Sequence, residues 1–577
     1  MNANLISERG AFVENVTDNY SSISPDMLQV RGVALQQPEH KTRAVEPRQP
    51  FLVSAMSDVQ KRELACIVAA WVLVAVLFWR WWFEPRHIAD VWRFGFNSAV
   101  LACEVMLPAY YFLFFARIKK PNPRLRLPIG HRVAMVVTKA PAEPWTLVRG
   151  TLEAMLAQDY PHDTWLADED PRAETLDWCR RNGVQVSSRK NVAEYHRSTW
   201  PRRTKCKEGN LAYFYDNRGY DRYDFVVQMD ADHRPAAGYL EAMLQPFVDS
   251  DVGYVSAPSI CSANASESWT ARGRLMVEAP LHGALQAGYN GGFAPLCIGS
   301  HYAVRTFALR DIGGLGPELA EDHSTTFLFN VNGWKGVHSL DAEAVGEGPG
   351  SFADFATQEL QWAKSLIKIL LTLTPRHLHK LPLKLKFQFL FSQCWYLLLG
   401  VTMLMSVLIP IIAICTNQPF VRISYAGFLC YSSALAAVLI PAVLWIRRNG
   451  WCRPKKIKLI TWETVLLQFA RWPWVMLGIL AACREALFKR QKDGFRVTPK
   501  GGQMVDEFPL ALLLPYALLT ILSGLPVILI SDANYATGYY FASAVNSLIY
   551  SLTAVAIVFL HYLETSPDQP PFKQRGG

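Results

Sequence analysis

The sequence predicts a membrane α-helical bundle into which a cytosolic α/β domain is inserted. Hydrophobic residues make up 51% of the 577-residue chain and charged residues 19%, which is too apolar for an ordinary soluble protein and too charged for one buried wholly in lipid. The apolar residues are gathered into blocks of the roughly 20 residues that a helix needs to cross a bilayer. Between the second and third blocks, short apolar runs alternate with helical patterns over residues 118–385, as in an α/β domain.

Six of the apolar blocks are predicted to span the membrane. These are residues 64–83, 94–116, 387–415, 423–446, 508–530 and 539–563. The predicted order along the chain is a polar tail at 1–60, two spans within 61–117, the cytosolic domain at 118–385, two spans within 386–447, an interfacial helix and loop at 448–506, two spans within 507–563 and a polar tail at 564–577. No cleavable signal peptide is visible.

The segment 461–488 is apolar enough to span as well, but Arg and Lys cluster on both sides of it, at 447–458 and 489–500. Positive charge favours the cytosolic side of a membrane, so both flanks are expected there. Arg471 lies in the middle of the segment, beside Trp472 and Trp474. Because Arg and Trp suit the membrane interface, we predict a helix along the cytosolic surface, with both chain termini and the α/β domain in the cytosol.

The formal net charge is +9, and the basic residues gather next to the apolar blocks. This distribution indicates topology signals and attraction to anionic membrane lipid. The basic residues form no long stripe with interleaved aromatics, so no nucleic-acid partner is predicted. The eleven cysteines include no CxxC pair and no zinc-like spacing, and we interpret them as reduced, apolar side chains.

Acidic residues follow two predicted strands of the α/β domain. The strand at 164–167 ends at Asp168, and the strand at 223–229 leads into Asp230-Ala231-Asp232. In an open α/β sheet, ligands bind beyond the carboxyl ends of the strands. Asp230 and Asp232 offer hard oxygen ligands that suit Mg²⁺ or Mn²⁺ bridging a diphosphate. Asp168 can contact a nucleotide base or ribose, or it can belong to a solvated acidic turn.

Two further motifs carry groups that suit catalysis. Lys207 opens a Gly-containing turn, which can approach a phosphate or be a basic surface turn. Glu321-Asp322 follows a Gly-rich stretch, and a carboxylate there can act as a general base toward a hydroxyl. The alternative is an acidic helix start.

A helical stretch that turns apolar from Leu366 onward carries Gln358, Gln361 and Trp362. The two amides lie on one helix face at i and i+3, with Trp362 beside them. An indole with flanking amides can hold a sugar ring. A Trp at the membrane interface is the alternative interpretation.

In this order the elements resemble those of the processive family 2 glycosyltransferases, of which the bacterial cellulose synthase catalytic subunit is the best-known type. That family has an Asp after an early strand, then DxD, ED and QxxRW. The matching residues here are Asp168, Asp230-Ala231-Asp232, Glu321-Asp322 and Gln358–Trp362. In addition, 207–211 resembles the family's KxGNL, and Phe495-Arg496-Val497-Thr498-Pro499-Lys500 resembles its FxVTxK gating loop.

The resemblance implies a GT-A fold and an inverting transfer with Asp322 as the base. The donor-binding residues that it implies are Asp168, Lys207, Asp230, Asp232, Thr498 and Lys500, the acceptor-binding residues are Glu321, Gln358, Gln361 and Trp362, and the metal ligands are Asp230 and Asp232. It further implies a bacterial inner membrane protein, a polysaccharide acceptor and subunits of an export complex as possible partners. The sequence at the metal site, Asp-Ala-Asp-His, is similar to that of glucan synthases, so UDP-glucose is the expected donor.

The sequence departs from the family pattern at two places. Gln361 stands where QxxRW has Arg, which removes a cation near the donor diphosphate and puts processivity in doubt. The alternative function is therefore the transfer of a single sugar to a lipid-linked acceptor. The early acidic element is Asp168-Glu169-Asp170, so the nucleotide contact can come from Asp168 or Asp170.

Overall fold

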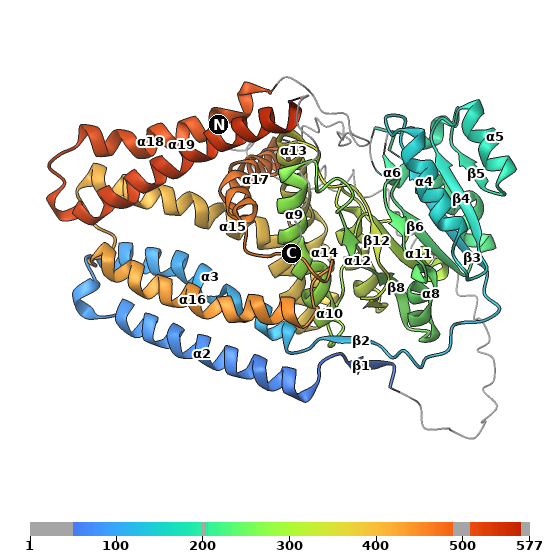
Figure 1. Cartoon of the computed structure of the whole chain (residues 1–577), viewed down its shortest axis with the longest axis horizontal. Helices are drawn as coiled ribbons and strands as arrows, with labels where there is room; N and C mark the ends of the chain where they lie inside the picture. Colours follow the sequence, from blue (N-terminus) through green and yellow to red (C-terminus); the bar gives the residue numbers. More distant parts are fainter. Residues whose placement is uncertain (1–49, 199, 201–202, 205, 489–507, 567–577) are drawn as a thin grey trace, which may run out of the picture.

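The computed structural model describes residues 50–566 apart from 199, 201, 202, 205 and 489–507. A helical bundle forms one end of the molecule and an α/β domain the other (Figure 1). Helices α13 (Phe352–Thr372) and α17 (Trp462–Phe488) lie between the two. The predicted combination of a bundle and an inserted α/β domain is confirmed.

The α/β domain is built on a seven-stranded sheet with the order β11-β8-β10-β6-β3-β4-β5. The strands are β3 Val133–Lys139, β4 Asp163–Asp168, β5 Gln185–Ser188, β6 Phe225–Met229, β8 Val252–Ser256, β10 His301–Arg305 and β11 Lys335–His338. β3 pairs in parallel with β4 and β6, whereas β10 is antiparallel to both β6 and β8. Since β4 and β6 run the same way, the acidic residues that follow them meet at one edge of the sheet.

The sheet is buried on both faces, which explains the continuous apolar runs in its central strands. All seven residues of β3 are buried. Val133, Met135 and Val137 pack into the core on one face, and Ala134 and Val136 pack into the core on the other. This alternation fixes the register of β3, because a slip by one residue would exchange the two faces.

A second, three-stranded sheet and several helices complete the α/β domain. The small sheet has the order β7-β12-β9, formed by Arg234–Pro235, Ala344–Val345 and Ser259–Ile260. The helices that matter for the site are α4 Trp145–Leu156, α6 Lys207–Phe214, α9 Trp269–Pro280 and α12 Glu321–Val331. The small sheet places the residues after Asp232 next to the segment 344–347, so it helps to shape the edge where the site lies.

Among the described residues, seven helices are long and apolar enough to cross a membrane. They are α2 Asp58–Trp82, α3 Val91–Phe115, α15 Leu383–Thr416, α16 Tyr425–Arg448, α17 Trp462–Phe488, α18 Leu514–Leu529 with the turn before it, and α19 Thr537–Thr565. Six of them correspond to the predicted spans. The seventh, α17, is the segment that we predict to lie on the membrane surface. Its length and composition are compatible both with a span and with a helix along the surface.

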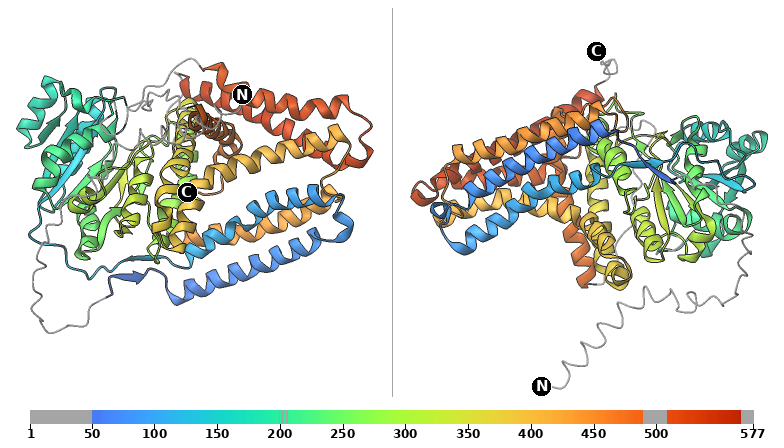
Figure 2. Two further views of the ribbon diagram at one scale, coloured as in Figure 1. Left: turned by 180° about the vertical axis from the view of Figure 1, so that it is seen from behind. Right: turned by 90° about the horizontal axis from the view of Figure 1, so that it is seen from below.

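The direction of α17 separates it from the other six helices. Figure 1 looks down its axis, whereas the other six lie along the long axis of the molecule, and the right-hand view of Figure 2 shows the crossing from the side. Arg471 in the middle of α17 donates two hydrogen bonds to Glu359 of α13, at 3.0 and 2.8 Å. The cation in this apolar helix is thus paired with a carboxylate between the bundle and the α/β domain.

Two helices begin earlier than the apolar pattern indicates. Helix α2 starts at Asp58, because Ser57 caps its first turn and Gln60 completes the capping box. Helix α13 starts at Phe352 behind the cap of Ser351, so Gln358 lies well inside it. Part of the predicted polar tail is also ordered, since Leu52–Ser54 pairs with Lys119–Pro121. Capping side chains are polar, so they escape a prediction based on apolar runs.

The predicted topology can be checked by cysteine labelling in a variant whose exposed native cysteines are replaced by Ser. Lys455→Cys and Lys492→Cys should both react only with a membrane-impermeant reagent applied from the cytosolic side, because positive charge flanks α17 at both ends. Gln418→Cys, in the loop between α15 and α16, should react only from the opposite side. Reaction of positions 455 and 492 from different sides would make α17 a seventh span.

Candidate active site

A cleft of about 470 Å³ opens at the edge of the sheet where β4 and β6 end. It is lined by seven of the residues that the sequence singles out, namely Lys207, Asp230, Glu321, Asp322, Gln358, Gln361 and Trp362. These residues come from α6, from the loop after β6, from the first turn of α12 and from α13. The fold therefore brings the separate sequence motifs to one cavity.

Asp168 lies along the same edge, although it does not line this cleft. It is the last residue of β4, and its buried carboxylate is 3.4 Å from Lys139 Nζ at the end of β3. Its Oδ1 accepts a hydrogen bond from the backbone N–H of Asp170, while Oδ2 has no hydrogen-bond partner among the described residues. Asp170 is exposed and pairs with Lys190 at 2.7 Å. Burial raises the pKa of Asp168 despite the neighbouring Lys139.

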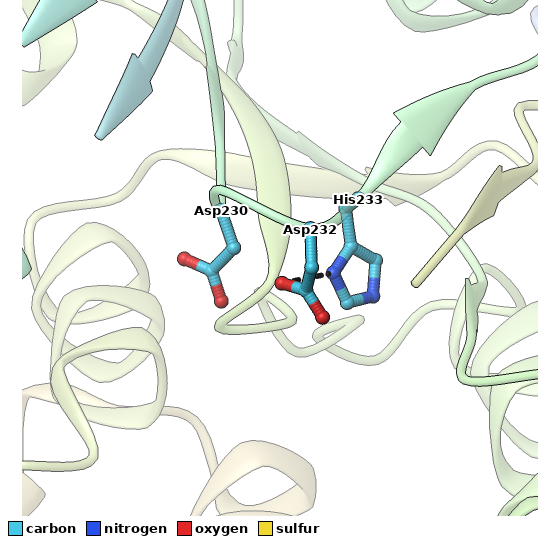
Figure 3. Close-up of side chains that lie close together, drawn as sticks. All are labelled: Asp230, Asp232 and His233. Carbon is cyan, nitrogen blue, oxygen red and sulfur yellow. Dashed lines mark hydrogen bonds and ion pairs between the residues drawn. The ribbon is translucent and has the colours of Figure 1, made fainter. Parts of the chain in front are cut away.

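Asp230, Asp232 and His233 form a cluster after β6 in which one ligand atom from each residue lies within 4.8 Å of the others. Figure 3 shows the three side chains projecting to the same side of the loop. The two carboxylates at this spacing can hold a divalent cation, because hard oxygen ligands suit Mg²⁺ or Mn²⁺. The donor set therefore fits the metal predicted from Asp230 and Asp232.

The environment of His233 points to a supporting role in this cluster. Its Nδ1 is 3.2 Å from Asp232 Oδ1 (Figure 3), and its Nε2 is 2.9 Å from the hydroxyl of Ser259. Burial opposes the charge on His233, but Asp232 outweighs it and raises the pKa of the imidazole to about 10. Since both ring nitrogens are engaged, His233 fixes the position of Asp232. The backbone N–H of Glu347 fixes the other carboxylate oxygen, at 2.9 Å.

Lys207 lies between the two acidic motifs. Its Nζ is 3.0 Å from Asp230 Oδ1 and 3.5 Å from Glu321 Oε1, and it donates a hydrogen bond to the backbone oxygen of Gly299. Burial opposes the charge on Lys207, but Asp230 and Glu321 outweigh it and raise the pKa of the ammonium group. The ammonium therefore stays charged and reduces the repulsion between the carboxylates around it.

Glu321 and Asp322 open helix α12, where the helix dipole favours negative charge. The Oε2 atom of Glu321 accepts a hydrogen bond from the Tyr302 hydroxyl at 2.8 Å. Burial, only partly offset by Lys207, raises the pKa of Glu321 to about 7, and burial also raises the pKa of Asp322. A carboxylate with a raised pKa is a stronger base than an exposed one, which suits proton transfer near neutral pH.

The carboxylate of Asp322 is held at the wall of the cleft. Its Oδ1 accepts a hydrogen bond from the backbone N–H of His323 at 2.8 Å. Its Oδ2 lies so near Gly299 that a Cβ atom there would be 3.0 Å away, closer than Cβ contacts normally come. Glycine at position 299 thus lets the backbone approach Asp322.

Arg274, a residue outside the predicted site, also lines the cleft beside Trp362. The guanidinium of Arg274, from α9, lies 4.5 Å from the ring centroid of Trp362. It donates hydrogen bonds to Gln358 Oε1 at 2.6 Å and to Glu278 Oε1 at 3.0 Å. Arg274 therefore covers one face of the indole and orients the neighbouring amide. No motif marks it, because α9 approaches α13 only in the folded chain.

Ion pairs fasten the end of α17 to the loop that precedes Asp322. Glu485 of α17 pairs with Lys364 at 2.5 Å and with Lys368 at 3.8 Å, both on α13. Lys368 also pairs with Glu318 at 2.8 Å. The side chains of Lys364, Glu485 and Glu318 are each 9% exposed, so the pairs are largely shielded from water.

Two predicted donor-binding residues, Thr498 and Lys500, lie outside the described residues. The remaining predicted residues lie either in the cleft or along the sheet edge beside it. The arrangement combines two carboxylates that can hold a cation, a charged lysine, a buried carboxylate and an indole. Together these groups can bind an anionic leaving group at one end and a hydroxyl-bearing acceptor at the other.

The comparisons with known proteins match this chemistry. Residues 225–447 match the family described as Glycosyl transferase family group 2. The cellulose synthase catalytic subunit [UDP-forming] of Xanthomonas axonopodis pv. citri (strain 306) is 24% identical over 286 residues, which cover 47% of this chain and 37% of that protein. The cellulose synthase 1 catalytic subunit [UDP-forming] of Komagataeibacter xylinus is 23% identical over 334 residues, covering 55% and 43%. The chain thus spans less than half the length of these relatives.

Solved structures are similar at a lower level. Glucosyl-3-phosphoglycerate synthase from Mycobacterium tuberculosis, in complex with Mn²⁺, UDP and glucosyl-3-phosphoglycerate, is 15% identical, with 44% of this chain and 81% of that chain covered and a TM-score of 0.28. GalNAc-T7 with UDP, GalNAc and Mn²⁺ is 12% identical, with 40% and 45% covered and a TM-score of 0.28. These scores are too low to carry an argument about the site.

The chain matches this glycosyltransferase family over residues 225–447, which include strands β6, β8, β10 and β11 of the α/β sheet. It is similar to cellulose synthase catalytic subunits at modest identity. The family resemblance, the fold class and the enzyme class predicted from the sequence motifs are therefore confirmed.

The metal site gives a prediction that can be measured without turnover. Asp230→Asn and Asp232→Asn should each weaken the binding of Mn²⁺ to the purified protein at least about tenfold, because each removes a charged oxygen ligand. Electron paramagnetic resonance of free Mn²⁺ during a titration measures this. Asp251→Asn, an exposed carboxylate paired with Lys335, is the matched control and should leave binding unchanged. Equal affinity for Mn²⁺ in the wild-type protein and all three variants would exclude this cluster as the metal site.

Proposed function

We propose that this protein is a multi-pass membrane glycosyltransferase that moves a sugar, with inversion, from a nucleotide sugar to a growing polysaccharide. The preferred donor is UDP-glucose. The cellulose synthase relatives are named as UDP-forming, which supports a UDP-linked donor. The observation that carries the proposal is the convergence of Asp230, Lys207, Asp322 and Trp362 on one cleft from four separate segments.

Asp322 acts as the general base in this proposal. It takes the proton from the acceptor hydroxyl while that oxygen forms a bond to the anomeric carbon of the donor sugar. The bond between the anomeric carbon and the diphosphate oxygen breaks, and the nucleoside diphosphate leaves with the electron pair. Attack from the face opposite the leaving group inverts the configuration. The hydrogen bond from His323 and the close approach of Gly299 hold the carboxylate in place for this transfer.

The donor is held at the sheet edge. Asp230 and Asp232 would hold Mg²⁺ or Mn²⁺, which when bound neutralises charge on the diphosphate. Lys207 lies beside Asp230 and adds a fixed positive charge for the same leaving group. Asp168 contacts the nucleotide in preference to Asp170, since Asp168 is buried at the end of β4 and its Oδ2 is 3.4 Å from Lys139, whereas Asp170 is exposed and pairs more closely with Lys190, at 2.7 Å.

In this proposal the acceptor lies against Trp362, which lines the same cleft. Arg274 covers one face of this indole, so a sugar ring packs on the face that remains. Gln358 and Gln361 line the same cleft and supply hydrogen-bonding groups, whereas Glu321, the third predicted acceptor-binding residue beside Trp362, lies against Lys207. Gln358 is oriented by Arg274, which fixes its amide for this contact.

The placement in the membrane follows from the charge distribution. Arg447 and Arg448 end helix α16, and Lys455 and Lys456 follow in the loop after it. Under the positive-inside rule, these charges support a cytosolic α/β domain at a bacterial inner membrane. The bundle beside the cleft supports export of the product through the inner membrane, with further subunits as possible partners. Gln361 favours the alternative, in which one sugar is added to a lipid-linked acceptor.

The base assignment predicts that Asp322→Asn lowers the transfer rate by a factor of roughly 10²–10⁴, because the amide keeps the shape and loses the basicity. Affinity for the donor should stay nearly unchanged. Asp311→Asn, at an exposed carboxylate that accepts a hydrogen bond from Trp334, is the matched control and should retain the native rate. A near-native rate for Asp322→Asn would assign the base to another residue.

The same base predicts a pH dependence. Asp322 must be ionised to accept a proton, and burial raises its pKa above the ordinary value of about 3.9. The rate should therefore fall as the pH decreases, and the fall should begin at a higher pH than for an exposed aspartate. Measurement of the rate at saturating donor between about pH 4 and pH 8 tests this. A rate that stays constant down to the ordinary aspartate range would contradict the assignment.

The size of the product separates polymer synthesis from single transfer. Purified protein in nanodiscs, supplied with labelled UDP-glucose, should yield a product whose length grows with time, because the acceptor platform retains the chain end between transfers. Gel filtration or mass spectrometry of the product measures this. A product carrying only one added sugar, across acceptors and times, would replace the polysaccharide proposal with the lipid-linked alternative.

A further inference from the structure

A second cavity, of about 940 Å³, lies between α2 and α16 at the ends of these helices that adjoin the α/β domain. One part of its wall is apolar. Ile67 comes from α2, and Pro441 and Leu444 come from α16. The side chain of Leu444 is 53% exposed on the flank of the helix, so the cavity opens toward the surroundings of the bundle.

The other part of the wall is strongly basic. Arg447 and Arg448 end helix α16, and Lys455 and Lys456 follow in the next loop. The carboxylate in the lining is Glu63, which pairs with Arg448 at 3.3 Å. Within the part of the chain that the structure describes, no carboxylate lies within ion-pair distance of Arg447, Lys455 or Lys456. Much of the positive charge at this cavity is therefore uncompensated.

The cavity is preformed, because hydrogen bonds join its two walls. The indole N–H of Trp445 donates to Glu63 Oε2 at 3.1 Å, and the amide of Gln60 donates to Asn449 Oδ1 at 2.8 Å. Beyond α16 the chain is anchored by the buried Arg453, whose Nε donates to the backbone oxygen of Leu340 at 3.0 Å. Arg453 thus holds in place the start of the loop that carries Lys455 and Lys456.

We propose that this cavity binds an anionic glycerophospholipid. Its phosphodiester faces Arg447, Lys455 and Lys456, and an acyl chain lies along Ile67 and Leu444. The combination of charge and apolar wall selects this ligand. A free phosphate would make no contact with the apolar wall. The headgroup of a zwitterionic lipid carries a cation, which the basic wall would repel. Basic pockets between membrane helices are suited to anionic headgroups for this reason. The site is independent of glycosyl transfer.

Native mass spectrometry of the full-length protein in detergent tests the proposal. Dioleoylphosphatidylglycerol should bind more tightly than dioleoylphosphatidylcholine, which has the same acyl chains. The double variant Arg447→Gln/Lys456→Gln should weaken the binding of phosphatidylglycerol by about 30-fold, since each cation near a headgroup contributes about 1 kcal/mol. Arg447 and Lys456 are exposed, so the double variant should keep the native thermal unfolding temperature.

The matched control is Arg117→Gln/Lys384→Gln, which removes two exposed cations at the same end of the bundle but outside the cavity. It should retain the native affinity for phosphatidylglycerol. Equal affinity for the two lipids, or equal weakening by the two double variants, would overturn the proposal. Binding of inorganic phosphate or glycerophosphoglycerol as tight as that of the lipid would identify a site for free phosphate compounds and would likewise overturn it.

Discussion

The candidate site depends on the neutralisation of several carboxylates that the fold gathers at one sheet edge. Asp230 and Glu321 lie against the same ammonium group, that of Lys207. Without this cation, like charges at such short range in a buried place would raise each other's pKa and favour their neutral forms. Lys207 is therefore the counterion around which the site is assembled. In the proposed reaction the same ammonium group would also stabilise the anionic leaving group, because it lies beside Asp230.

The sequence allowed much of this to be predicted, because strand ends and helix starts obey local rules. β4 and β6 end where their apolar runs end, and parallel pairing through β3 brings their acidic residues to one edge. The alternative interpretation of Glu321-Asp322, an acidic helix start, is correct, and both residues also line the cleft. That coincidence shows why two interpretations of an acidic motif need not exclude each other.

Long-range contacts set the limit of that prediction. Nothing near Arg274 in the sequence indicates that its guanidinium lies on Trp362, since the contact depends on how α9 and α13 pack. The same holds for Arg471. From the sequence we predict that this residue lies at the membrane interface, and in the structure it pairs with Glu359. Hydropathy describes the surroundings of a residue along the chain, whereas Arg274 contacts the amide of Gln358 and Arg471 the carboxylate of Glu359, both more than eighty positions away.

The ion pairs between α13, α17 and the loop before Asp322 make the α/β domain inseparable from the bundle. A protein cut at the predicted boundaries, 118 and 385, would lose Glu485 and Arg471. Lys364, Lys368 and Glu359 would then remain without these partners. Removing one member of a buried ion pair costs about 3–5 kcal/mol, a large fraction of the stability of most domains. The domain boundaries predicted from composition therefore do not enclose a unit that folds independently. The isolated α/β domain would lack contacts that stabilise it in the whole protein.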